Sequence, residues 1–278
     1  MQQICCAVVV AVKGRPYASG NLNRDCLMRV LALVTLLTSL LLAPRPAAAQ
    51  QTAREIVDEV DRLLRGESSR GRFTMEIVTE HWSRSLEIRV WSLGTEYALA
   101  RVLAPAKEAG TATLKIDEEV WNYLPRVDRT IKVPPSLMMG SWMGSHFTND
   151  DLVKDSRLIE DYEIEIAFEG RRDGEEVWEF ALIPKPEAPV VWGKIVMQVR
   201  KRDKMPTWMR YYDERDRLER TMTLSEFRVM GGRLVPTVTD VIPADEPNER
   251  TTVRYEELEF DVGLSPDFFS LRNLRASR

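Results

Sequence analysis

The sequence predicts a mostly β domain of the α+β class, in which an antiparallel sheet follows a single opening helix. Apolar and polar residues alternate in one segment after another, most regularly at Tyr162, Ile164, Ile166 and Phe168, and this period is typical of strands with one buried face. Strands and helices do not alternate along the chain, so a parallel sheet is not expected. We expect roughly ten or eleven strands, and a sheet of that size must curl or close.

The opening helix is predicted between Thr52 and Gly66. Thr52 and Glu55 have the spacing of a capping box, in which each side chain bonds the other residue's backbone amide. The apolar residues that follow share one helical face: Ile56, Val60, Leu63 and Leu64. Gly66 is a typical C-terminal stop. This helix must therefore lie against another part of the fold.

A secretion signal is predicted before the helix. Residues 30–43 are almost wholly apolar, yet too few to span a bilayer, which takes about 20 residues. Arg29 precedes this run, and Ala47 and Ala49 supply the small residues of a cleavage site. We therefore expect a signal peptide over residues 1–49, with Met28 as a second candidate start, and a single exported domain over residues 50–278.

The composition excludes several classes of function. All three cysteines lie in the predicted leader, so the exported chain has no disulfide, no cysteine-bound metal and no cysteine for a lipid anchor. The formal net charge is −4 with both signs well mixed, whereas a nucleic-acid-binding protein shows a basic surface. We expect a soluble monomer that binds no nucleic acid.

The remaining strands are predicted at 73–77, 86–90, 162–168, 178–182, 195–199, 208–212, 218–229, 234–242 and 251–260. Two architectures stay open at this point. A curled sheet would enclose an apolar ligand cavity, while two packed sheets would fill each other's space. In the first case the cavity would be lined by inward-facing residues of the alternating strands: Phe73, Ile77, Ile164, Ile166, Trp178 and Phe180.

Residues 134–151, which we call the apolar loop, break the strand pattern. Two prolines open the segment, and Gly140 and Gly144 loosen its backbone. Its large apolar residues are Leu137, Met138, Met139, Trp142, Met143 and Phe147. Methionine adapts to many shapes and is common at apolar binding surfaces. The loop is interpreted either as a lid over an apolar cavity or as a fixed part of the core.

The sequence offers little catalytic chemistry. The two histidines are His81, beside Trp82 at a predicted strand end, and His146 in the apolar loop. Neither belongs to a hydrolase or zinc-protease motif. Asn149 and Asp150 are better explained as the cap of a short helix that begins at Asp151. We expect no catalytic residues, no cofactor and no metal, and hence no enzyme.

Several segments together resemble the LolA-like outer-membrane lipoprotein-sorting proteins. They are YLPR at 123–126, RTI at 129–131, MGS at 139–141, GSHFTNDDL at 144–152 and LSPDFF at 264–269. The resemblance extends over residues 50–278 and points to a larger, divergent branch. It implies a half-open barrel, made of one strongly curved antiparallel sheet, with an N-terminal helix and a short helical lid or plug on its concave side.

The resemblance also implies a function. Such a protein would be a periplasmic carrier that binds acyl chains of lipoproteins or lipids for transfer toward the outer membrane. Its partners would be an inner-membrane transporter and an outer-membrane acceptor. Arg126 and Arg129 would meet headgroups at the cavity mouth, unless they form only a solvated turn. The alternative is a non-carrying periplasmic sensor, or an accessory module of an inner-membrane lipid exporter.

Overall fold

The computed structural model describes residues 51–154, 158–188 and 190–276. The predicted leader, its cleavage site after Ala49 and the candidate start Met28 lie outside the described residues. Residues from Gln51 onward form one compact unit. Among the described residues, no helix has the length and hydropathy needed to cross a bilayer.

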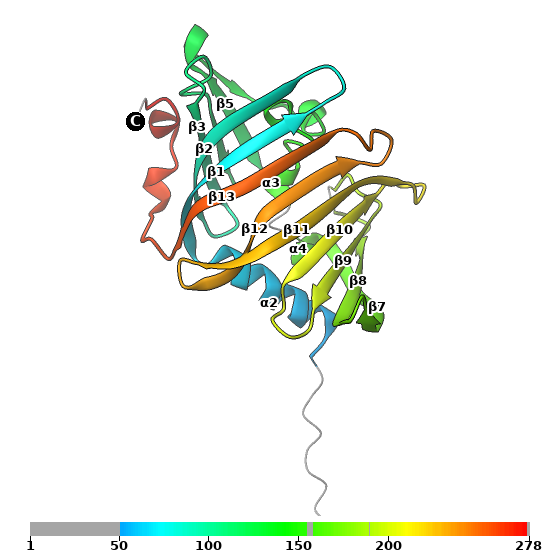
Figure 1. Ribbon diagram of the computed structural model, residues 1–278. Helices are drawn as coiled ribbons and strands as arrows, with labels where there is room; N and C mark the ends of the chain where they lie inside the picture. The colour runs from blue at the N-terminus through cyan, green and yellow to red at the C-terminus, as the bar shows by residue number, and fades with distance from the viewer. Residues whose placement is uncertain (1–50, 155–157, 189, 277–278) are drawn as a thin grey trace, which may run out of the picture. The chain divides into compact units, whose positions relative to one another are not determined.

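One antiparallel sheet contains every strand described (Figure 1). The strands are β1 (Ser68–Val78), β2 (Ser83–Leu93), β3 (Tyr97–Ala104), β4 (Ala112–Ile116), β5 (Glu119–Leu124), β6 (Arg129–Lys132), β7 (Tyr162–Arg172), β8 (Glu175–Pro184), β9 (Lys194–Arg200), β10 (Pro206–Tyr212), β11 (Leu218–Met230), β12 (Arg233–Pro243) and β13 (Arg250–Phe260). The helices are α2 (Ala53–Arg65), α3 (Asp151–Lys154), α4 (Leu158–Asp161) and α5 (Leu271–Leu274). Short 3-10 turns are η1 (Pro125–Val127), η2 (Pro135–Leu137), η3 (Trp142–Gly144) and η4 (Pro266–Phe268).

The sheet is curved and unclosed. Its strand order is β6-β5-β4-β3-β2-β1-β13-β12-β11-β10-β9-β8-β7, so β6 and β7 are its two edges. All neighbours are consecutive in the chain except β1 and β13, which pair along most of their length. The single curved sheet confirms the predicted fold class, and the alternative of two packed sheets is wrong. The thirteen strands exceed the ten or eleven that we expected.

The opening helix α2 has the predicted start and end. Thr52 and Glu55 form both bonds of the capping box, and Gly66 ends the helix with a φ of 69°. Ile56, Val57 and Val60 are buried and pack against the half of the sheet formed by β7–β12. Leu63, predicted on the buried face, is 36% exposed. We call the face of the sheet on which α2 packs the inner face. The helix therefore covers one half of this inner face.

The C-terminal segment packs against β3, β4 and β5. Phe269 and Leu274 are buried together with Leu99, Ala112 and Leu114. In β4 four consecutive residues are buried, from Ala112 to Lys115. Successive side chains of a strand point to opposite faces, so this part of the sheet is covered on both faces.

Candidate functional site

The apolar loop forms a compact structure of its own. The backbone amide of Trp142 donates to the carbonyl of Phe147 at 2.7 Å, and that of Asp150 donates to Met138 at 2.8 Å. Ser141 and Thr148 pair as an isolated β-bridge. Met143 adopts the left-handed region, with φ of 50° and ψ of 27°. Residues other than glycine rarely occupy this region, so surrounding contacts must hold the loop in shape.

Three side chains of the loop pack on the inner face of the sheet. Trp142, Met143 and Phe147 belong to the apolar cluster that contains Phe73 and Ile77. Trp142 is 5% exposed, and its indole Nε1 donates to Thr113 Oγ1 of β4 at 3.1 Å. The loop therefore covers the half of the inner face that α2 leaves uncovered.

A second apolar cluster lies under α2. Phe180 is fully buried there, while Ile164 and Trp178 are half-buried. The rings of Trp178 and Phe180 lie 6.3 Å apart. Phe147 packs against both clusters, so it joins the two halves of the covered face.

Other predicted site residues lie apart from these clusters. Leu137 and Met139 are 57% and 49% exposed, which places them on the outer side of the apolar loop. Ile166 of the edge strand β7 is 36% exposed. Met138 packs in a separate small cluster. Arg126 and Arg129 are exposed at the turn between β5 and β6.

Three of the predicted lining residues on the inner face are covered by other parts of the chain. The predicted lining residues Phe73, Ile77 and Phe180 are buried by the apolar loop and by α2. A pocket of about 470 Å³ does exist between β11, β12 and β13, but charged residues line much of it: Glu226, Arg228, Arg254 and Glu256. An acyl chain would therefore need the loop to move before it could reach the apolar face.

A buried ion pair fastens the end of the apolar loop to the sheet. Arg220 of β11 donates to both carboxylate oxygens of Asp151, at 2.6 and 2.7 Å, and to the carbonyl of His146 at 3.1 Å. The side chains of Arg220 and Asp151 are 5% and 11% exposed. The guanidinium carbon also lies 4.7 Å from the Trp192 ring and 4.2 Å from the Tyr211 ring. We did not predict this pair, because the sequence marks no link between residues 69 positions apart.

The helix that follows the loop begins at Asp151, as predicted. At the start of this helix, α3, the side chains of Thr148 and Asp151 each accept a bond from the other's backbone amide. Asn149 instead donates to the carbonyls of Leu137 and Gly140, at 3.1 and 3.0 Å. The side-chain amide of Asn149 thus closes the loop upon itself.

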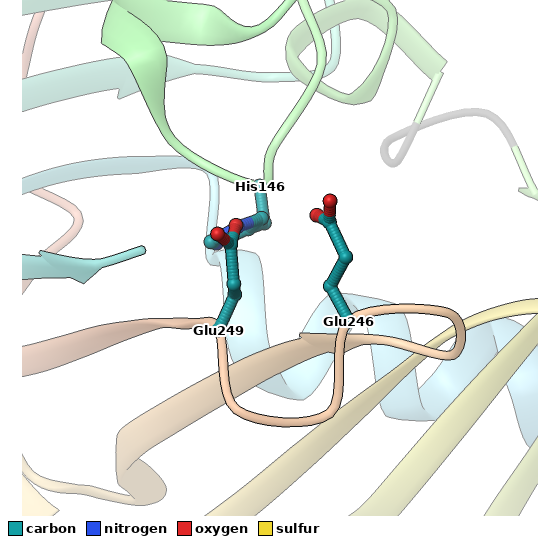
Figure 2. Close-up of side chains that lie close together, drawn as sticks. All are labelled: His146, Glu246 and Glu249. Atoms are coloured by element: carbon teal, nitrogen blue, oxygen red, sulfur yellow. The ribbon is translucent and has the colours of Figure 1, made fainter. Parts of the chain in front are cut away.

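His146 attaches the middle of the loop to β13. Its backbone amide donates to Thr251 Oγ1 at 3.0 Å, and its Nδ1 lies 2.9 Å from the same oxygen. Its Nε2 lies 3.2 Å from Glu249, and Glu246 lies beside them (Figure 2). The backbone amide of Glu80 and the His146 side chain lower the pKa of Glu249, while the charge of Glu249 raises the pKa of Glu246.

Comparison with known proteins supports the observed fold. A family model described as an uncharacterized protein matches residues 94–276, which is well over half of the chain. A search of curated protein sequences gave no match.

Three solved structures are similar over most of their length. A DUF1329 family protein from Desulfovibrio piger has a TM-score of 0.74 and 22% identity, covering 80% of this chain and 97% of its own. A putative outer membrane lipoprotein-sorting protein domain from Vibrio parahaemolyticus has a TM-score of 0.72 and 22% identity. The match covers 81% of this chain and 98% of that domain. A LolA superfamily protein from Nitrosomonas europaea has a TM-score of 0.69 and 19% identity. The match covers 81% of this chain and 100% of that protein. At these identities the similarity demonstrates a shared fold.

Proposed function

The chain belongs to the family of uncharacterized proteins whose model it matches, and its fold is LolA-like. From this premise we propose that it is a non-enzymatic periplasmic carrier. It would bind acyl chains of lipoproteins or lipids on the inner face of its sheet and carry them toward the outer membrane. The observation that carries the proposal is how this face is covered. The apolar loop, which has its own attachments to the sheet, lies over half of the face. In a filled sandwich, a second sheet would lie there instead.

The chemistry of the covered face suits an acyl chain. Its two clusters consist of aliphatic and aromatic side chains, such as Phe73, Ile77 and Phe180. Each buried CH₂ group contributes about 0.8 kcal/mol, so a chain of about 14 carbons would contribute about 10 kcal/mol before ordering costs. Affinity of this kind needs no catalytic group. It needs apolar side chains and a cover that can move aside.

The fastening of the loop suits a cover that opens. Its polar attachments run to separate strands, through Thr113 in β4, Arg220 in β11 and Thr251 in β13. Polar groups at these points can bond to water once the loop leaves, which keeps the cost of opening moderate. Closure must also be moderate, because apparent affinity falls with the fraction of protein in the open state.

Uptake of a fluorescent fatty acid tests the proposal. The wild-type protein is expected to bind it, and Met143→Asp is expected to weaken binding strongly, since a carboxylate facing an apolar chain loses its hydration. Met143 packs on the inner face. Met139→Asp is the matched control, because Met139 is 49% exposed on the outer side of the loop and should bind like wild type.

One outcome would contradict the carrier, and another would contradict only the role of the apolar loop as its cover. The first is a wild-type protein that neither takes up the probe nor contains extractable lipid, which would favour the non-carrying sensor or exporter module. The other is a folded Met143→Asp protein, verified by its circular dichroism and melting temperature, that binds with unchanged affinity. In that case the apolar loop would be fixed core.

The proposed location predicts how the chain is processed. Protein recovered from the periplasmic fraction should begin at Gln50, followed by Gln51 and Thr52, after cleavage behind Ala49. N-terminal sequencing measures this directly. Recovery of residues 1–49 with the rest of the chain in the membrane fraction would argue against the carrier as a free periplasmic protein.

A further inference from the structure

Three side chains from two distant parts of the chain meet at the edge of the apolar loop. His146 comes from the loop, and Glu246 and Glu249 come from the turn between β12 and β13 (Figure 2). Their nearest nitrogen and oxygen atoms all lie within 4.8 Å of one another. We propose that these residues bind a divalent transition-metal ion, with Zn²⁺ as the ion that fits best.

The turn places the two carboxylates together. The amide of Glu249 donates to the carbonyl of Glu246 at 2.9 Å, which closes a four-residue turn around Pro247. Residues at the two ends of such a turn lie close together, and proline favours its second position. The charges that act on the Glu246 carboxyl are those of Glu249, Asp245 and His146. Two carboxylates are thus held next to each other beside an imidazole.

The surroundings hold two of these side chains in place. The amide of Glu80 donates to one oxygen of Glu249 at 2.8 Å, so the other oxygen faces His146. The fully buried Thr251 contacts His146 Nδ1 at 2.9 Å, leaving Nε2 directed at the carboxylates. Metal-binding histidines commonly bond an outer group through their second nitrogen, which sets the tautomer and the ring orientation. His146 and Glu249 have side chains that are only 14% and 15% exposed.

The ligand set selects the kind of ion. One imidazole and two carboxylates suit Zn²⁺, whereas Ca²⁺ and Mg²⁺ prefer oxygen ligands alone. Tetrahedral Zn²⁺ with bonds of about 2.0 Å needs ligand atoms about 3.3 Å apart. His146 and Glu249 already meet this spacing at 3.2 Å. Glu246 is exposed, so its side chain can rotate toward the pair, and water would complete the coordination.

Calorimetric titration with Zn²⁺ tests the site, on protein purified without a polyhistidine tag. Wild type is expected to bind Zn²⁺ at this site and to melt at a higher temperature with it, while Ca²⁺ has little effect. His146→Gln and Glu246→Gln should each weaken this binding at least about 10–100-fold, the loss seen when even an outer partner of a metal ligand is removed. Every variant is purified in the same way as wild type, so any Zn²⁺ held by cysteines of unprocessed protein is the same in each sample.

The chain supplies matched controls. Asp245→Asn removes the same charge one residue away from Glu246, and His81→Gln removes the other histidine, which is exposed. Both should bind Zn²⁺ like wild type. Glu246 is exposed, so its variant is expected to fold normally. If Glu246→Gln, or His146→Gln in a folded state, binds like wild type, or if wild type shows no binding that these variants lose, the proposed site is wrong.

A bound ion would also tie the apolar loop to the turn between β12 and β13, and this consequence rests on the proposed carrier function. Zn²⁺ should then slow fatty-acid uptake by wild type and leave Glu246→Gln unaffected. The two hypotheses fail separately: absence of uptake under all conditions would remove the carrier, while the calorimetric result on the metal site would stand.

Discussion

Replacing Asp151 with alanine is expected to weaken the attachment of the apolar loop by about 3–5 kcal/mol. The substitution removes the Asp151 carboxylate from the Arg220 guanidinium, whose side chain is only 5% exposed. At about 1.4 kcal/mol for each factor of ten, the ratio of closed to open loop should fall by about two to three and a half powers of ten. Hydrogen exchange at the amides of Trp142 and Asp150, which are bonded within the closed loop, measures this ratio.

Two controls show whether the effect comes from the buried Arg220 losing its partner or merely from shortening a side chain. Asp151→Leu combined with Arg220→Leu removes both charges of the pair, and the combination should recover much of the stability because neither charge is then buried without the other. Glu119→Ala breaks the Lys132–Glu119 pair, whose side chains are about half exposed, and should cost less than about 1 kcal/mol. Equal effects of Asp151→Ala and Glu119→Ala would show that the buried pair does not hold the loop.

Trp142→Ala is expected to have a comparable effect through a different contact. Truncating a buried tryptophan typically costs about 3–5 kcal/mol, and Trp142 also loses its bond to Thr113. If the loop opens while the sheet stays folded, the loss of global stability cannot exceed the free energy of closing the loop. We therefore expect rapid exchange in the loop together with a smaller shift of the denaturation midpoint.

If the apolar loop is a fixed part of the core, the lost free energy should appear in global unfolding and not in opening of the loop. The whole loss would then appear in the free energy of unfolding measured with denaturant, and the loop amides would exchange only with the rest of the sheet. Leu137→Ala is the control, because Leu137 is 57% exposed and surface changes usually stay within about 0.5 kcal/mol. Both measurements on one Trp142→Ala sample distinguish a lid from core.

The sequence was sufficient for the strands that have one covered face. In β1, Phe73, Met75 and Ile77 are buried and alternate with less buried neighbours, as their pattern predicted. The region of β3 to β6 gave no such pattern. Leu99 and Leu114 pack against Phe269 and Leu274 from the C-terminal segment, so these strands carry apolar residues on both faces. Period-two alternation disappears wherever a second layer covers a sheet.

The sequence could predict only those features of the candidate site that lie within one segment of the chain. The composition of the apolar loop indicated its apolar packing, and the structure places Trp142, Met143 and Phe147 on the sheet. The composition could not distinguish these residues from Leu137 and Met139, whose exposure depends on the path of the folded loop. The contacts of Asp151 with Arg220, and of His146 with Glu249, join residues 69 and 103 positions apart. No periodicity links such positions, so only the sheet topology reveals them.

The pairing of β1 with β13 also bears on how the chain acquires its fold. Every other neighbouring pair is a local hairpin or short connection, but Arg70 and Glu259 of these two strands are 189 positions apart. Closing so large a loop is costly in entropy, and long-range β pairing forms slowly. A chain secreted from its N-terminal end would expose the edge of β1 until β13 had also emerged. An unpaired strand edge is a template for association with other chains, so protection of β1 during this interval should decide the yield of native protein.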